Sequence, residues 1–126
     1  MFDRNLVSDI ITLIEENLEI VLQRTEHIES VNDFTSGTGM ILLDSVCMKL
    51  VAVGESIKNL DKISNKELLT KYSQIDWKQA MGMRDIIVHH YFDIDAEQIF
   101  STLKEDIPIL TDTLKKMRND LNRNNC

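Results

Sequence analysis

The sequence is poor in the two residues that most often interrupt regular helices. Its 126 residues include only four glycines and one proline. A protein built from many short strands needs tight turns, which glycine and proline usually supply. The scarcity of both therefore argues against a many-turned β protein and favours a few long helices.

Cysteine is scarcer still, with only Cys47 and Cys126 in the chain. Cys47 lies in an apolar run, where a cysteine usually acts as a small buried hydrophobe. No disulfide framework is predicted, which fits a cytoplasmic location. Charged residues are spread through the first sixteen positions, so we expect neither a signal peptide nor a membrane span there and no membrane association.

Basic residues are also outnumbered, with 14 lysines and arginines against 21 aspartates and glutamates and a formal net charge of −7 at pH 7. A protein that binds nucleic acid over its whole surface is usually basic. Any contact with RNA must then be local, in a cationic cleft on an acidic body. Alternatively, the acidity serves solubility and a basic partner. Apolar residues make up 43% of the chain, enough for the core of a single domain over residues 1–126.

The first segment has the periodicity of a long amphipathic helix. Its apolar residues recur at steps of four and three, which predicts one helix over residues 2–30. A second stripe of Leu6, Leu13 and Ile20 predicts a helix that is central or also used in an oligomer. The charged side chains of this helix are expected to face water, and they are Glu15, Glu16, Glu19, Arg24 and Glu26.

A polar, glycine-containing stretch over 30–39 predicts a loop, and residues 40–60 then predict a buried helix. Gly54 lies within this helix, where glycine costs about 1 kcal/mol relative to alanine. A close crossing by a neighbouring helix would explain its presence. The methionines in apolar runs are expected to fill the core, and they include Met40, Met48, Met81 and Met83.

Capping patterns predict where the remaining helices begin. Ser64 with Glu67 has the spacing of a capping box and predicts a short helix over 65–72. Asp76 is expected to cap a helix from 77 to about 89, and Asp95 to cap the last helix. The sequence therefore predicts an all-α fold, an antiparallel bundle of four main helices plus one short helix.

The last helix is expected to be imperfect. Pro108 lies inside it and should kink it, because proline cannot donate the helical hydrogen bond. The polar tail over 118–126 is expected to fray.

The candidate chemistry lies between Arg84 and Tyr91, where an arginine, two histidines and a tyrosine fall within eight residues. Arginine can hold a phosphate through its planar fork of donors, and histidine can move a proton near neutral pH. Together they predict phosphodiester chemistry. On an ideal helix Arg84 and His89 lie about 140° apart. They can converge only if the helix ends near His89 or if two copies of the chain share the pocket.

The same residues also have structural interpretations. Arg84 can be a surface ion-pair partner, and His89 and His90 a polar helix end that suits the helix dipole. Tyr91 can be a core aromatic residue. Glu55 is either a solvated edge residue or an acceptor that orients a nearby arginine or histidine.

Metal and cofactor chemistry has little support. His89, His90, Asp93 and Asp95 are a conceivable ligand set, but adjacent histidines point apart on a helix and no standard ligand spacing is present. The chain also has no glycine-rich phosphate loop. We therefore expect no metal and no cofactor.

The pattern Arg84-X4-His89-X-Tyr91 resembles the Arg-X4-His-X-Tyr motif of the HEPN superfamily, in its HepT-like toxin branch. The resemblance extends over most of the chain, from the first helix to Pro108. Further matching segments occur in the order that HepT-like proteins show, and they are Gly54-Glu55, Asp76-Trp77, Met83-Arg84-Asp85 and Tyr91-Phe92-Asp93-Ile94-Asp95.

This resemblance implies a HEPN-like fold and a metal-independent endoribonuclease that acts on RNA as a homodimer with a composite cleft. Arg84 and His89 would be catalytic, with Glu55, Asp85 and His90 in supporting positions. It also implies a toxin role, with an MntA-type nucleotidyltransferase antitoxin that silences the toxin by adding AMP to Tyr91. The alternative is a non-catalytic HEPN module that binds a nucleotide or the nucleotidyltransferase.

Overall fold

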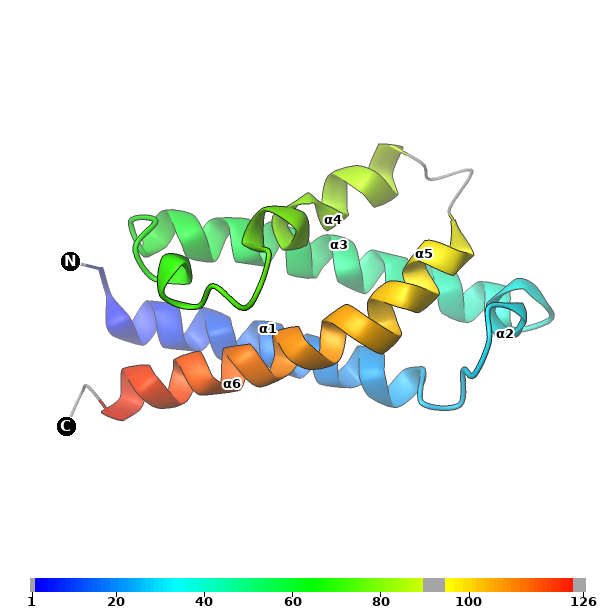
Figure 1. The fold of residues 1–126 in the computed structure, drawn as a ribbon, viewed down its shortest axis with the longest axis horizontal. Coiled ribbons are helices and arrows are strands. Elements are labelled where there is room, and N and C mark those ends of the chain that lie inside the picture. The colour runs from blue at the N-terminus through cyan, green and yellow to red at the C-terminus, as the bar shows by residue number, and fades with distance from the viewer. Residues whose placement is uncertain (1, 90–94, 124–126) are drawn as a thin grey trace.

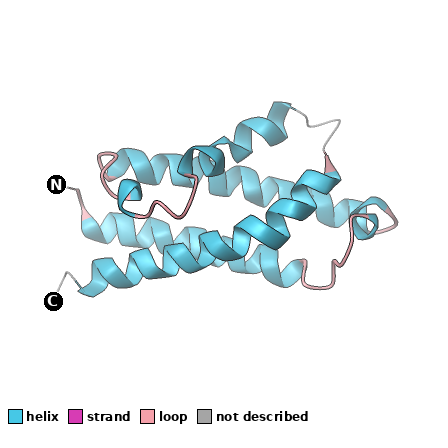
Figure 2. Cartoon of the chain, in the orientation of Figure 1, coloured by secondary structure: helices cyan, strands magenta, loops and turns pink. Residues whose placement is uncertain are grey.

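The computed structural model describes residues 2–89 and 95–123, and all regular secondary structure in these ranges is helical (Figure 2). The main elements are α1 (Arg4–Arg24), α3 (Gly39–Ile63), α4 (Trp77–His89) and a run of α5 (Ala96–Ser101), η2 (Thr102–Asp106) and α6 (Ile107–Arg123). Helix α1 packs on α3 and α6, and α3 packs on α4 (Figure 1). The predicted all-α antiparallel bundle is confirmed.

Two short elements connect the main helices: α2 (Asn32–Thr35) and η1, a 3₁₀ turn over Leu69–Lys71. Gly39 at the start of α3 lies directly against the backbone of α2. The approach is so close that a Cβ at this position would overlap the Asp33 carbonyl oxygen. None of the described helices is both long and apolar enough to cross a bilayer.

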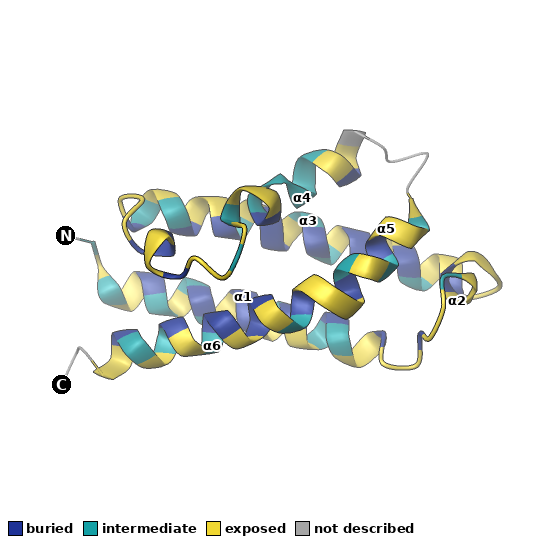
Figure 3. Cartoon of the chain, in the orientation of Figure 1, coloured by how far each residue is buried: buried dark blue, intermediate teal, exposed yellow. Residues whose placement is uncertain are grey.

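The apolar seam predicted for α1 forms the centre of the core (Figure 3). The helix is shorter than predicted, because it ends at Arg24 rather than at residue 30. Thr25 caps it, and its hydroxyl donates a hydrogen bond of 2.8 Å to the Val21 carbonyl. The members of this seam are all buried, and they are Val7, Ile11, Ile14, Leu18, Val21, Thr25 and Ile28.

Glu15 was expected to face water, and this prediction was wrong. The residue is 4% exposed, because α6 covers that side of α1. Its Oε1 lies 2.9 Å from Nε of Arg118, and Glu19 pairs with Lys115 one turn further along α1. Burial raises the pKa of Glu15, and the Arg118 charge opposes that rise. Arg118 and Lys115 therefore hold α6 on α1.

Helix α3 is less buried than predicted. Met40, Ile41 and Met48 are exposed on it, so the expectation that Met40 and Met48 fill the core was wrong. Met81 and Met83 do pack partly buried against the core. The core side of α3 includes Cys47, whose burial raises the pKa of its thiol to about 11.

The capping box predicted at Ser64 is absent, because Ser64 instead terminates α3. Asn65 and Lys66 follow with positive φ angles of 59° and 61°. The Lys66 N–H donates 2.8 Å to the Asp61 carbonyl, as in a helix C-terminal cap. Two left-handed residues cannot begin a right-handed helix, so the predicted helix over 65–72 is reduced to the turn η1.

The two aspartate caps are confirmed. Asp76 accepts a 3.1 Å hydrogen bond from the Gln79 N–H, and Asp95 accepts from the N–H groups of Glu97 and Gln98. Near Pro108 the predicted irregularity takes the form of the π-helical segment η2, directly before α6. Helix α6 runs on to Arg123, so fraying does not begin at residue 118 as expected, and residues 124–126 lie outside the description.

The start of α4 is held by a connection to α6. The Tyr72 hydroxyl donates a 2.7 Å hydrogen bond to Asp120, and the Trp77 ring N–H donates 2.9 Å to the Tyr72 carbonyl. Burial and the Asp120 carboxylate raise the pKa of Tyr72 to about 12. This connection fixes where α4, the helix that carries Arg84, begins.

Candidate functional site

Arg84 is placed by the close crossing of α3 and α4. A Cβ at Gly54 would lie 3.2 Å from the Arg84 backbone nitrogen and 3.3 Å from the Ala80 carbonyl oxygen. The absence of a side chain at position 54 therefore lets α4 approach, as the sequence predicted. The next residue of α3, Glu55, is then beside the arginine, with 3.2 Å between Arg84 Nε and Glu55 Oε1.

A second carboxylate contacts the same guanidinium, because Asp85 Oδ1 lies 3.0 Å from Arg84 Nη1. The three side chains are each about half exposed, at 43% for Arg84, 51% for Glu55 and 50% for Asp85. One positive and two negative charges give this trio a formal charge of −1. Its exposure keeps the Coulomb attraction screened by water.

The guanidinium keeps donors for a further ligand. Arginine carries five N–H donors in a rigid plane. The contacts to Glu55 and Asp85 engage Nε and Nη1, and Nη2 makes no hydrogen bond with the described residues. A phosphate could therefore bind through Nη2 while Glu55 and Asp85 contact Nε and Nη1.

The other candidate residues fall at or beyond the end of α4. His89 is the last residue of that helix, and its side chain is not among those described. His90 and Tyr91 lie outside the described residues altogether. The structure thus brings Arg84, Glu55 and Asp85 together. The contact between Arg84 and Glu55 joins two segments that the sequence singled out separately.

Two of the four residues considered as metal ligands, His90 and Asp93, lie outside the described part of the chain. Within residues 2–89 and 95–123, histidine, cysteine and acidic side chains form no group of three or more that could hold a metal ion.

Exposed apolar side chains lie on both α3 and α4, the helices that carry Glu55 and Arg84. Ile41 and Met48 are exposed on α3, and Glu55 follows them at the same spacing of seven residues, so the three lie on one side of that helix. Val88 is exposed one turn after Arg84 on α4. We call Ile41, Met48 and Val88 the exposed apolar stripe.

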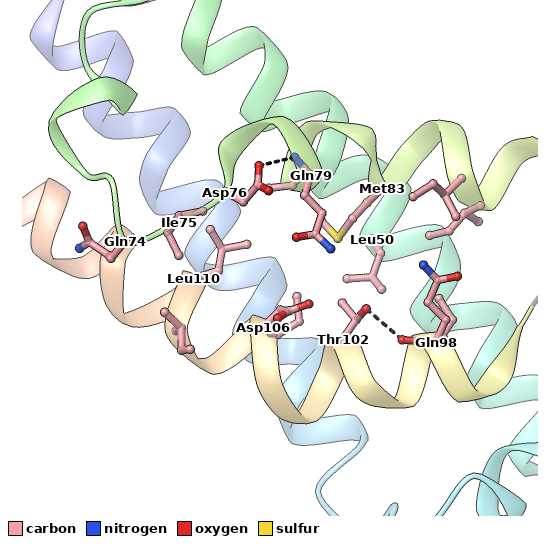
Figure 4. A pocket seen from close by; sticks show the side chains of 16 residues that line it. Leu50, Gln74, Ile75, Asp76, Gln79, Met83, Gln98, Thr102, Asp106 and Leu110 are labelled. Carbon is pink, nitrogen blue, oxygen red and sulfur yellow. Dashed lines mark hydrogen bonds between the residues drawn. The ribbon is translucent and has the colours of Figure 1, made fainter.

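The opposite side of α4 forms a separate cavity of about 270 Å³ against α5, η2 and α6 (Figure 4). Arg84 is not among the residues that line it. This cavity was not predicted from the sequence, although polar residues recur at helical spacing along both of its walls.

The comparison with protein families agrees with the motif around Arg84. The family model described as "Ribonuclease HepT-like" matches residues 14–117. The chain belongs to the HepT-like ribonuclease family. The matched range contains α3 and α4, and with them Glu55, Arg84, Asp85 and His89.

Two relatives that are named as ribonucleases match much of the chain. A "Probable ribonuclease HepT" from Thermococcus cleftensis is 30% identical over 102 residues, which is 74% of this chain and 87% of the relative. A "Putative RNase" from Caldanaerobacter subterraneus subsp. tengcongensis is 32% identical over 104 residues, covering 82% and 87%.

A relative from Methanocaldococcus jannaschii is longer. It is named "Gamma-glutamylcyclotransferase and putative RNase" and is 33% identical over 111 residues, which is 88% of this chain. The match spans about half of that relative, 47% of its length. No solved structure matches the chain.

Proposed function

We propose that this HepT-like protein is a metal-independent endoribonuclease that cleaves RNA as a homodimer. The observation that carries the proposal is the placement of Arg84, half exposed on α4, with its Nε against Glu55 and with Nη2 making no hydrogen bond to the described residues. This is the arrangement expected of a guanidinium that receives a phosphate.

The chemistry needs only groups of the chain and of the RNA. The ribose 2′-hydroxyl attacks the adjacent phosphorus, a bond from the 2′-oxygen to phosphorus forms, and the bond to the 5′-oxygen breaks. One His89 imidazole takes the proton of the 2′-hydroxyl, and a second, protonated His89 gives a proton to the leaving oxygen. Arg84 stabilises the negative charge that gathers on the phosphoryl oxygens.

The supporting residues act through this pair. Glu55 is a positioning residue, because it fixes the direction of the Arg84 side chain from a neighbouring helix. Asp85 holds Nη1 of the same guanidinium. His90 would add positive charge beside His89 when it is protonated.

A twofold dimer would supply two copies of Arg84 and His89 to one cleft, and so an acid and a base from identical chains. The exposed apolar stripe supports this arrangement. Its members lie on α3 and α4, the two helices that carry Glu55 and Arg84, so a second copy that covers Ile41, Met48 and Val88 would lie beside the site.

The proposal includes a toxin role. An MntA-type nucleotidyltransferase antitoxin would transfer AMP from ATP to the Tyr91 hydroxyl, with release of pyrophosphate. The bulky anionic group would repel RNA two residues from His89. Mass spectrometry after co-expression with the nucleotidyltransferase of a neighbouring reading frame should show adenylyl mass on the peptide with Tyr91, and none in Tyr91→Phe. Adenylyl mass on other peptides alone contradicts this role.

The nuclease proposal is tested with purified protein and single-stranded RNA in excess chelator. Wild type should cleave the RNA, and His89→Ala should cleave it at least about a hundredfold more slowly, as expected when a general acid–base catalyst is removed. Arg123→Ala is the matched control, because it removes an exposed cation that pairs with Asp120 of its own helix. Equal rates for wild type and His89→Ala would reject the assignment.

A non-catalytic HEPN module is the second candidate, and the formal charge of −1 on the Arg84 trio favours it. Such a module would bind a nucleotide or the nucleotidyltransferase and leave RNA intact. The chelator assay separates the two, because a binding module gives no cleavage product at any protein concentration.

A further inference from the structure

The bundle has one seam that its helices do not close. Helix α1 packs closely on α3 and α6, and α4 packs closely on α3, but α4 has no comparable contact with α6. The cavity of about 270 Å³ lies in this fourth seam, with Leu50 of α3 at its floor (Figure 4).

The composition of the two walls explains why the seam stays open. On the α4 side Asp76, Gln79, Met83 and Ile86 line the cavity at steps of three and four residues, so they share one face. Helices of a closed bundle meet through apolar side chains at such positions. Asp76 and Gln79 interrupt that contact at one end, and Met83 and Ile86 leave the other end apolar.

The opposite wall repeats this pattern. Gln98, Thr102 and Asp106 line the cavity at steps of four residues, and Figure 4 shows Thr102 and Asp106 facing the α4 side chains Gln79 and Met83. Thr102 and Asp106 are the two ends of the π-helical segment η2. Such segments are rare and often occur at functional sites. A polar wall and an irregular helix thus coincide at the same place.

The charges of the cavity restrict its ligand. Its charged lining residues are Asp76 and Asp106, and neither forms an ion pair with a residue in the described part of the chain. No lysine, arginine or histidine is among the described lining residues. An RNA phosphate would be repelled here, whereas an apolar group beside a cation would be favoured.

We propose that this cavity is a docking site for a protein partner, which inserts an apolar side chain from a segment rich in lysine or arginine. The exposed rim residues Ile86 and Ile109 enlarge the apolar contact. The volume lies just below the roughly 300–1,000 Å³ of small-molecule pockets and suits one or two side chains. The site does not include Arg84 and does not depend on RNA cleavage.

The test uses designed peptides with protein whose isoleucine methyl groups are isotope-labelled for NMR. An amphipathic lysine–leucine peptide should shift the methyl signals of Ile86, Ile87 and Ile99, which line the cavity. Two control peptides replace lysine by glutamate or leucine by serine, and both should bind at least about fivefold more weakly. Shifts confined to isoleucines elsewhere would overturn the proposal.

Substitutions of two exposed residues at the rim of the cavity test whether the peptide binds there. Ile109→Glu and Asp106→Lys should each weaken binding of the cationic peptide about fivefold or more. Asp106→Lys should also reduce the difference in affinity between the cationic and the acidic peptide. Leu13→Glu, which places the same charge on an exposed position of α1 outside the stripe and the cavity, should leave the affinity unchanged. A short single-stranded RNA should not move the cavity methyl signals. If the RNA moves them and the cationic peptide does not, the site is an RNA site and the proposal is wrong.

Discussion

At the scale of single residues, the site depends on what surrounds Arg84. Its guanidinium is held from α3 by Glu55 and from its own helix by Asp85, so its direction is fixed before any ligand arrives. The same carboxylates compete with phosphate for the positive charge. In the proposed function Glu55 would therefore have two opposed effects on RNA binding, orienting Arg84 and weakening its attraction for the phosphate backbone.

Substitution of Glu55 separates these effects. Glu55→Gln should lower KM for RNA by about two- to fivefold, because an exposed ion pair contributes up to about 1 kcal/mol. It should also lower kcat, because the guanidinium loses its charged acceptor. Steady-state kinetics on single-stranded RNA measure both. Glu19→Gln, which removes a similarly exposed partner of Lys115, should change neither. A higher KM for Glu55→Gln would contradict the competition.

Tyr72 predicts a pH dependence of stability. Its pKa is raised to about 12 from an ordinary value of 10.0, so the folded state favours the neutral phenol. The stabilisation is complete below pH 10 and is lost as the pH rises from 10 to 12. Urea unfolding over this range should show stability falling more steeply for wild type than for Tyr72→Phe. Parallel curves would show that folding does not raise the pKa of Tyr72.

At the scale of helices, the crossing of α3 and α4 aligns the site. Gly54 allows the two backbones to approach where Ala80, Met81 and Arg84 of α4 pass it. Gly82 on α4 offers a matched comparison, because a Cβ there would meet nothing within 4 Å.

Alanine at these two positions should have different effects. Gly82→Ala should stabilise the protein by up to about 1 kcal/mol through helix propensity. Gly54→Ala should stabilise the protein less or not at all, because its Cβ would press on the α4 backbone. It should also slow RNA cleavage by displacing Arg84. Urea midpoints and cleavage rates test the pair. Equal stabilisation with unchanged cleavage would show that the crossing does not constrain the site.

The sequence predicted those helical features that depend on local chemistry. The α1 seam, the caps at Asp76 and Asp95 and the close crossing at Gly54 are all confirmed. The errors arose where another helix decides the outcome. Periodicity alone could not show that α6 covers Glu15, and the pattern at Ser64 fitted a helix start although that residue ends α3.

The candidate site was predicted in part. The motif identified Arg84, and the glutamate beside Gly54 suggested an acceptor, but only the packing of α3 on α4 shows that the two meet. The exposure of Met48 could not be read from composition, because an apolar helix face looks the same whether it meets the core or a second copy.

At the scale of the whole molecule, two faces flank α4. One includes Arg84 and the exposed apolar stripe, and the other includes the acidic cavity. A dimer across the first face would leave the second open to a basic partner, which suits a chain of net charge −7.

The stripe predicts how the proposed dimer can be broken. Met48→Lys should convert the protein to a monomer in sedimentation equilibrium and abolish cleavage, because a charge would be buried at the interface. Ile109→Glu places a charge on the cavity side and should leave the dimer intact. A wild-type monomer that cleaves RNA at full rate would contradict the composite cleft.

The central claim is that the guanidinium of Arg84 stabilises phosphate chemistry, and single-turnover cleavage of RNA in chelator tests it most directly. Arg84→Ala should cleave RNA about a hundredfold or more slower than wild type. Arg84→Lys should be nearly as slow, because lysine cannot reproduce the planar fork of donors. Arg123→Ala should cleave as fast as wild type. Full-rate cleavage by folded Arg84→Ala would contradict the account.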